Sequence, residues 1–126
     1  MQLIKRLFVA SISLLTLSMV ACEQQVDPKN PPIVELDTYQ LNITGEGGDI
    51  SIYYAVTNPV KGAKPEVTTN VDWITPGEVG NGQIIIHVAE SNVSEERMGF
   101  VTINYRGIEK PLRVYVIQDK QPLNDF

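Results

Sequence analysis

The sequence predicts an all-β protein, a sandwich of about six to eight short strands, on two observations. Apolar and polar residues alternate with a period of two in several runs between residues 33 and 119. Clusters of Gly, Pro, Asn and Asp separate these runs at intervals of about 8–12 residues, and no amphipathic segment has the length of a helix. This pattern is typical of an immunoglobulin-like β-sandwich.

The first half of the predicted domain opens with a hairpin. Residues 39–43 alternate, the Gly-rich stretch 45–48 turns the chain, and alternation resumes over residues 50–56. A loop with Pro59, Gly62 and Pro65 then leads to a short extended piece around Val67. Residues 70–74 follow before the stretch 75–82, whose composition predicts turns.

The second half contains three further predicted strands. Residues 84–88 alternate, and the polar segment 91–97 has the length of one helical turn, with Asn92 or Ser94 as its cap. Residues 101–105 then lead through a tight turn at Arg106-Gly107 into a final strand that runs to residue 118. Because proline cannot donate to a strand ladder, this strand is expected to begin at Pro111 or to lie at an edge.

The amino terminus predicts export and lipid attachment. Lys5 and Arg6 precede an uninterrupted apolar run over residues 7–21, which is too short to span a bilayer and fits a secretory signal. Residues 19–22, Met-Val-Ala-Cys, resemble the lipobox of bacterial lipoproteins, in which the signal is cut before the cysteine and acyl chains are attached to it. The alternative is an ordinary signal peptide followed by an unpaired thiol.

These features divide the chain into four parts. They are a signal peptide at 1–21, the acylated Cys22 with a flexible, proline-containing tether to residue 32, a domain at 33–119, and a tail at 120–126. An extended tether would hold the domain up to about 33 Å from the lipid. We therefore expect a cell-envelope protein, an outer-membrane lipoprotein exposed at the surface or facing the periplasm, whose membrane contact is the anchor at Cys22.

Charge and cysteine content limit the partners. Without Lys5 and Arg6 the formal charge changes from −5 to −7, and the remaining lysines are scattered, which disfavours binding to nucleic acid. With the single cysteine acylated, no disulfide forms within the mature chain. Stability must then come from an apolar core, which a domain of this length can supply.

A family resemblance supports the same fold. Four sequence features follow one another in the order found in the BACON domain. They are Asp72-Trp73-Ile74, the strand 84–88, the loop from Asn92 to Arg97 that enters Gly99-Phe100-Val101-Thr102-Ile103, and the final strand ending in Gln118. The resemblance covers about residues 33–119. It implies an immunoglobulin-like sandwich associated with carbohydrate binding in Bacteroidetes, commonly preceding a catalytic domain, which here the seven residues after the domain do not supply.

The residues do not indicate catalysis, a metal or a cofactor. His87, the single histidine, lies opposite the inward positions of its strand and is expected on the surface, without a local nucleophile. Glu95 and Glu96 are adjacent, so they cannot face each other across a sugar. Glu46 and Asp49 with nearby carbonyls could chelate calcium, although hairpin geometry alone accounts for the glycine-rich turn.

Aromatic residues are the candidates for binding, because lectin-like sites pair a flat ring with polar groups that hydrogen-bond to hydroxyls. Trp73 fits this description, although a lone tryptophan after a strand in a small sandwich more often fills the core. Tyr53, Phe100 and Tyr115 fall on outward positions, and we expect them either together on one sheet face or as ordinary half-covered strand residues.

Two polar residues complete the candidate carbohydrate site. Asn92 offers an amide, and Arg97 could bind an acidic sugar, although pairing with Glu95 or with loop carbonyls is an alternative role. Two functions follow from these residues. The protein binds a dietary or host glycan, or it is a structural spacer or protein-interaction module of an envelope complex.

Overall fold

The computed structural model describes residues 26–123, so the predicted signal peptide, Cys22 and the last three residues lie outside the described part. No helix within residues 26–123 is long and apolar enough to cross a membrane. The described chain forms eight strands: β1 Ile33–Leu36, β2 Gln40–Ile43, β3 Gly48–Thr57, β4 Glu66–Thr69, β5 Ile74–Val79, β6 Gln83–Val88, β7 Arg97–Asn104 and β8 Leu112–Gln118.

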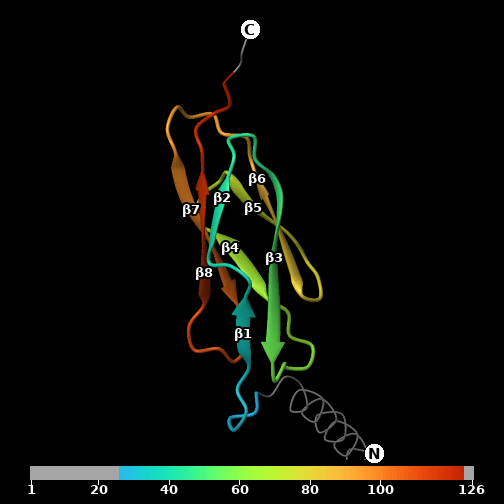
Figure 1. Ribbon diagram of the computed structural model, residues 1–126. Helices are drawn as coiled ribbons and strands as arrows, with labels where there is room; N and C mark the ends of the chain where they lie inside the picture. Colours follow the sequence, from blue (N-terminus) through green and yellow to red (C-terminus); the bar gives the residue numbers. More distant parts are fainter. Residues whose placement is uncertain (1–25, 124–126) are drawn as a thin grey trace, which may run out of the picture.

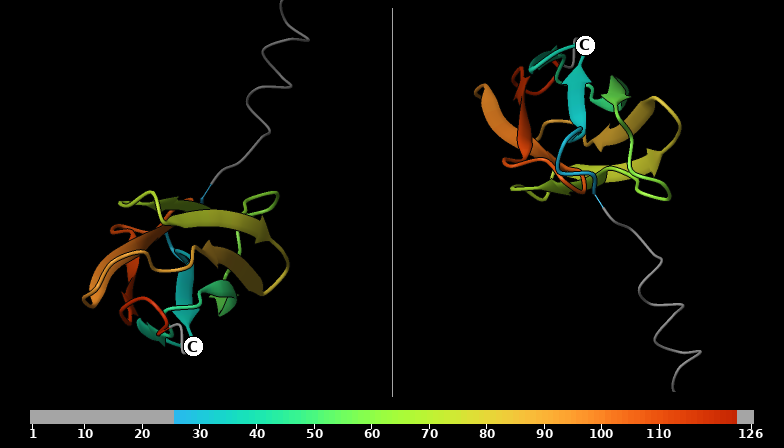
Figure 2. Two further views of the ribbon diagram at one scale, coloured as in Figure 1. Left: turned by 90° about the horizontal axis from the view of Figure 1, so that it is seen from above. Right: turned by 90° about the horizontal axis from the view of Figure 1, so that it is seen from below.

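The strands form two four-stranded sheets, one in the order β1-β3-β6-β5 and the other in the order β2-β8-β7-β4 (Figure 1). Seen along the strands, β7 and β8 lie on one side of the molecule and β6 on the other (Figure 2). If the strands are lettered A, A′, B, C, D, E, F and G along the chain, the sheets read ABED and A′GFC. This is the immunoglobulin order, so the predicted fold class is confirmed.

The first extended segment changes sheets partway along. β1 pairs antiparallel with β3, whereas β2, four residues later, pairs parallel with β8 in the other sheet. The predicted hairpin between residues 39–43 and 50–56 is therefore wrong, because the connection after β2 crosses from one sheet to the other. Alternation shows which residues point inward but does not identify the partner strand.

Two local predictions in the middle of the chain are also wrong. Residues 75–79, expected as turns, form most of β5, an edge strand that tolerates Pro76 and whose register with β6 shifts between Pro76 and Val79. Residues 91–96 contain bends and no helical turn. At residues 75–79, pairing with β6 overrides the local turn signals of Pro76 and Gly77.

The last two strands pair as predicted. β7 and β8 are antiparallel, with Arg97 opposite Gln118 and Ile103 opposite Leu112. The predicted turn at Arg106-Gly107 is present, closed by a hydrogen bond from the Ile108 amide to the Tyr105 carbonyl at 3.2 Å, and it forms part of a longer connection over residues 105–111. β8 lies between β2 and β7 and begins directly after Pro111. The proline, which has no amide N–H to donate, therefore stays outside this central strand.

Branched aliphatic side chains fill the space between the sheets. The fully buried residues come from strands of both sheets, which makes this a single core stabilised by removal of apolar area from water. They are Ile52, Ile74, Ile84, Ile86, Val88, Val101, Ile103, Val114 and Val116. A smaller cluster around Val34, Val60 and Tyr105 closes the end of the sandwich at which the described chain begins.

Both ends of the segment 26–32, which falls within the predicted tether, contact the domain. Val26 packs on the smaller cluster, and Pro32 is buried. Between them Asp27 accepts hydrogen bonds from the Lys29 amide and the Asn30 side chain, and these bonds lower the pKa of Asp27. A single valine in a polar segment gave no periodicity from which this packing could be predicted.

Gly99 allows a close approach between β7 and the corner that joins β4 to β5. A Cβ at this buried position would lie 2.6 Å from Cγ2 of Val71 and 3.0 Å from Cδ1 of Ile74. Only glycine fits there without displacing its neighbours. The corner can therefore cover the core next to β7.

We expect Gly99→Ala to lower the free energy of unfolding by about 1–3 kcal/mol, because the added methyl group overpacks this contact. Gly80→Ala is the matched control, since its Cβ would meet nothing closer than 3.7 Å. Chemical denaturation of both variants measures the difference. Equal stabilities would show that the corner shifts without cost.

Candidate functional site

The outer face of the β2-β8-β7-β4 sheet carries an aromatic pair, in which Phe100 is half-buried and Tyr115 is exposed. Phe100 on β7 and Tyr115 on β8 are directly opposite each other, and both point away from the core. Their ring centroids are 6.0 Å apart and their planes meet at 67°, an edge-to-face arrangement. The expectation that these two rings share one sheet face is confirmed.

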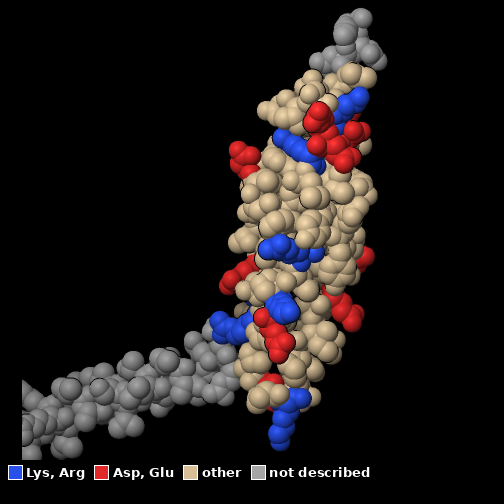
Figure 3. Space-filling view, turned by 90° about the vertical axis from the view of Figure 1, so that its left-hand side faces the viewer, with Lys and Arg blue, Asp and Glu red and all other residues tan. Residues whose placement is uncertain are grey.

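Two further apolar residues extend this pair along the strands. Met98 lies opposite Ile117 in the same β7–β8 register, and the Met98 side chain is 62% exposed. Met98, Phe100, Tyr115 and Ile117 together are called the outer-face patch. Figure 3 looks onto the side of the molecule on which β7 and β8 lie, and uncharged surface covers much of its upper half.

Polar groups surround the outer-face patch. The Arg113 guanidinium lies 4.2 Å from the centre of the Phe100 ring, where it covers part of one ring face. On the β2 side, Gln40 is opposite Tyr115 and Asn42 is opposite Ile117, with both amides exposed. The patch is therefore flanked by a cation on one side and by two amides on the other.

A hollow of about 290 Å³ adjoins the patch at the end of β2 and β8. Its lining combines carboxylate, amide and hydroxyl groups with apolar side chains that belong to the same sheet. The lining residues are Asn42, Ile43, Thr44, Glu96, Ile117 and Asp119. Ile117 and Asn42 are common to the hollow and to the sheet face, so the two form one continuous surface.

Tyr53 does not belong to this surface. It lies on β3, in the other sheet, opposite Gln83 of β6, and its side chain is 54% exposed. The expected three-ring cluster is therefore wrong, and only Phe100 and Tyr115 are neighbours. The alternation placed Tyr53 correctly on an outward position but could not show which sheet that position belongs to.

Trp73 and Arg97 form a second cluster at the end of the sandwich away from Val26. Trp73 is half-buried against the core, and the Arg97 guanidinium lies 4.3 Å from the indole centre. Trp73 is thus neither fully buried nor an open platform, because the core covers part of the indole and a cation covers one face.

Arg97 is also held by hydrogen bonds within the protein. Its Nε donates to Oε1 of Gln118 at 2.7 Å, its Nη1 to Oδ1 of Asn92 at 3.5 Å, and its Nη2 to the Glu90 carbonyl at 3.4 Å. Of the roles considered for Arg97, the bonding of a loop carbonyl is the one that the structure shows. Asn92 and Arg97 lie together at this end, apart from the aromatic pair.

Gln118 is the buried centre of this cluster. Its Nε2 donates to the Ala89 carbonyl at 2.8 Å and to the Thr44 carbonyl at 3.3 Å, while its Oε1 accepts from Arg97. The side chain therefore joins β8 to the β2–β3 connection and to the β6–β7 connection. No buried side-chain nitrogen or oxygen within residues 26–123 lacks a hydrogen-bond partner.

His87 is on the surface, as expected, with its side chain 51% exposed. Its Nδ1 contacts Oδ1 of Asp49, the residue opposite it on β3. In the part of the chain that the structure describes, no three His, Cys, Asp or Glu side chains gather as ligands for a metal ion. Asp49 thus pairs with His87, and Glu46 is exposed on the neighbouring connection.

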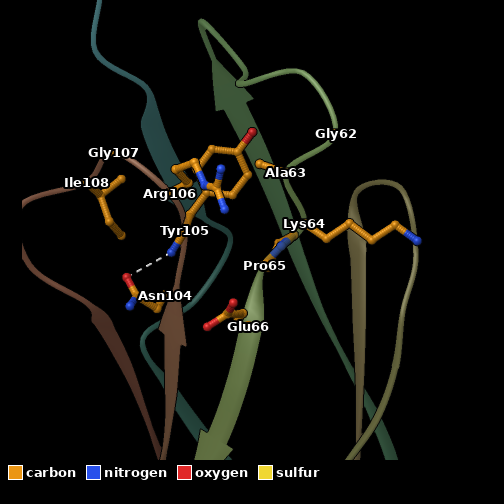
Figure 4. A pocket seen from close by; sticks show the side chains of 10 residues that line it. All are labelled: Gly62, Ala63, Lys64, Pro65, Glu66, Asn104, Tyr105, Arg106, Gly107 and Ile108. Carbon is orange, nitrogen blue, oxygen red and sulfur yellow. Dashed lines mark hydrogen bonds between the residues drawn. The ribbon is translucent and has the colours of Figure 1, made fainter. Parts of the chain in front are cut away.

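Another hollow, of about 490 Å³, lies at the opposite end of the molecule from Trp73. The β3–β4 connection and the β7–β8 connection form its walls (Figure 4). The Tyr105 hydroxyl accepts a hydrogen bond from the Val60 amide, and the Lys64 side chain extends away from the Tyr105 ring. Because Tyr105 is only 5% exposed, this hollow offers less ring surface for ligand stacking than the outer-face patch, in which Tyr115 is 39% exposed.

The flanking residues Arg113, Gln40 and Asn42 were not predicted as site residues. The same alternation that placed Tyr115 outward also places Arg113 outward, so this cation could have been found from the sequence. The two amides could not, because they reach the patch only through the parallel pairing of β2 with β8.

No protein-family model matches the chain, and no curated protein matches it in sequence. Among solved structures, the chain is similar to a GH5 xyloglucanase from Bacteroides ovatus in complex with an XXXG heptasaccharide, with a TM-score of 0.59 and 18% identity. The match covers 75% of this chain and 20% of the xyloglucanase chain. At this identity the similarity shows the fold alone.

Two smaller Bacteroides proteins are also similar. An NMR structure of a protein from Bacteroides thetaiotaomicron matches with a TM-score of 0.49 and 13% identity, over 79% of this chain and 98% of the other. One from Bacteroides vulgatus matches with a TM-score of 0.42 and 17% identity, over 74% and 95%. The chain is a β-sandwich module that resembles Bacteroides protein domains, and its BACON resemblance stays a prediction.

We expect Gln118→Leu to lower the free energy of unfolding by at least about 1–3 kcal/mol, because it leaves the Ala89 and Thr44 carbonyls and the Arg97 Nε without a buried partner. Gln121→Leu, at an exposed position, is the control and should be close to neutral. Thermal melting of both variants tests this. A Gln118→Leu protein as stable as the control would mean that water replaces the amide.

Proposed function

We propose that the protein is a cell-envelope lipoprotein whose non-catalytic, BACON-like sandwich binds carbohydrate on the outer-face patch. The observation that carries the proposal is the outward-facing pair of half-buried Phe100 and exposed Tyr115, which continues into a hollow lined by amide, hydroxyl and carboxylate groups. Neither feature is required by the core, since truncation of exposed side chains leaves no cavity.

The chemistry of a sugar suits this surface. A pyranose ring has one apolar face, which packs on an aromatic ring, and a rim of hydroxyls, which need donors and acceptors in the same plane. Tyr115, which is 39% exposed, provides the more accessible of the two aromatic rings. Gln40 and Asn42 provide amides beside it. Glu96 and Asp119 in the adjoining hollow add acceptors for hydroxyl groups.

One of the similar solved structures supports a glycan-related role. The first of them is a xyloglucanase in complex with a heptasaccharide, and this chain matches a fifth of that protein. The likeness supports a module of the kind found in proteins that handle polysaccharides. The type of glycan, dietary or host, is not specified by this comparison.

Met98 favours a second candidate function, an interface with an envelope protein. Its flexible side chain is highly exposed, and methionine adapts to varied apolar partners. In this case the outer-face patch would bind a protein surface, and the sandwich would serve as a scaffold or spacer. The two functions share one surface and differ in the ligand that the patch retains.

Tyr115→Ala is expected to weaken glycan binding by about three- to tenfold while leaving the melting temperature nearly unchanged, because the lost contact is on an exposed ring. A glycan array with the chain from residue 22 onward, followed by titration of the best glycan, measures the effect. Tyr53→Ala is the matched control, an exposed tyrosine on the other sheet. Equal loss in both variants, or no glycan retained by the unmodified protein, would favour the protein-interface function.

Cys22→Ser is expected to release a folded protein into the soluble fraction, because acyl chains contribute about 0.8 kcal/mol per buried methylene to membrane binding. Cell fractionation with detergent-free washes measures the distribution, and circular dichroism checks that the sandwich still folds. A Cys22→Ser protein that stays in the membrane fraction as fully as the unmodified one would contradict lipid attachment at this residue.

A further inference from the structure

The two ends of the sandwich differ in charge. The end at which the described chain begins consists of the turn at 27–30 and the connections 58–65 and 105–111, and is called the tether-end surface. Five cations and three carboxylates lie on or next to it, a formal charge of +2: Lys29, Lys61, Lys64, Arg106 and Lys110 against Asp27, Glu66 and Glu109.

The opposite end has the reverse balance. Its connections, 44–47, 70–73 and 89–96, the first residue of β7 and the segment 119–123 carry six carboxylates and two cations, a formal charge of −4: Glu46, Asp72, Glu90, Glu95, Glu96 and Asp119 against Arg97 and Lys120. Figure 3 shows acidic groups gathered near the upper end of the molecule and several Lys or Arg side chains toward the lower end. The molecule therefore has a charge gradient along the strand direction.

The lysines of the tether-end surface are available to a ligand. Lys29, Lys61, Lys64 and Lys110 are exposed, and none of them forms an ion pair with any residue between 26 and 123. A hollow of about 490 Å³ lies among these loops, and Lys64 extends outward from it (Figure 4). Their side chains are thus free to reach a negatively charged surface.

The chain geometry places this end next to the predicted lipid anchor. Val26 packs on the cluster that includes Val60 and Tyr105, and a Cβ on Gly107 would lie 3.0 Å from the Val26 side chain. Three residues separate Cys22 from Val26 in the sequence. Even fully extended, that stretch spans at most about 14 Å from one Cα to the other.

We propose that the tether-end surface rests on the phosphate-bearing headgroups of the membrane in which the anchor is inserted. This inference rests on the lipoprotein part of the proposed function and is independent of the ligand of the outer-face patch. The lysines contact lipid phosphates, and the acidic end points away from the membrane. The sandwich then stands with its strands directed outward.

The magnitudes are sufficient for such an orientation. A cation near an anionic membrane surface favours binding by about fivefold, and this attraction extends over a Debye length, about 8 Å at physiological ionic strength. Because about 14 Å is the upper limit of the link to Val26, the lysines can come within this range. An anionic membrane surface also repels the opposite, acidic end, which disfavours the inverted orientation.

The test uses acylated protein on vesicles of phosphatidylcholine alone or mixed with phosphatidylglycerol. A dye is placed by Glu109→Cys at the tether end or, as the matched position, by Glu95→Cys at the other end, and energy transfer to a labelled headgroup is measured. We expect transfer from position 109 to exceed transfer from position 95, with a larger difference on anionic vesicles. Combining Lys61→Gln, Lys64→Gln and Lys110→Gln should reduce that difference to its value on neutral vesicles.

A second measurement does not depend on acylation. The Cys22→Ser chain from residue 22 onward is sedimented with the same vesicles, and Lys64→Gln is compared with Lys120→Gln, which removes the same charge at the opposite end. We expect Lys64→Gln to reduce binding to anionic vesicles by up to about fivefold and Lys120→Gln to leave it unchanged. High salt should abolish the anionic preference of the unmodified chain.

Equal binding to neutral and anionic vesicles, or equal effects of the two lysine variants, would overturn the membrane contact. Glycan binding measured on the same lysine variants should stay unchanged. Loss of glycan binding with vesicle binding retained would count against the proposed ligand of the patch. Release of acylated protein from vesicles would count against the lipid anchor.

Discussion

The register between β7 and β8 is the constraint on which most other features of this protein depend. It turns Val101, Ile103, Val114 and Val116 toward the core. It also places Phe100 opposite Tyr115 on the outer face and Arg97 opposite Gln118 at the end of the pair. A shift of one residue would bury the aromatic rings and expose the valines. The core, the candidate site and the polar cluster are therefore consequences of one pairing.

Much of the fold could be predicted from the sequence because side-chain alternation is a local property. The runs at 50–56, 84–88 and 112–118 all became strands, and the last hairpin joined the strands expected of it. Strand partners were harder to predict, since β2 alternates in the same way whether it pairs with β3 or with β8. The position of Tyr53 on the second sheet was missed for this reason.

Other features depended on tertiary contacts that no local pattern records. Pro76 and Gly77 suggested a turn, but pairing with β6 made their segment an edge strand. Val26 looked like part of a polar linker, and its contact with the β7–β8 connection appears only in three dimensions. The amides of Gln40 and Asn42 likewise reached the candidate site through a strand far away in the sequence. Side-chain direction was thus predictable, whereas proximity was not.

The change of sheet between β1 and β2 also affects how the domain bears mechanical load. A pull on the chain at Val26, opposed by a ligand held on β7 and β8, would act nearly along the strands. β1 would then slide against β3 and β2 against β8, so the hydrogen bonds of each short pair would be stretched together rather than opened one after another. Two four-residue strands, each weak alone, would resist such shear in parallel, which suits a module attached at one end and loaded from its face.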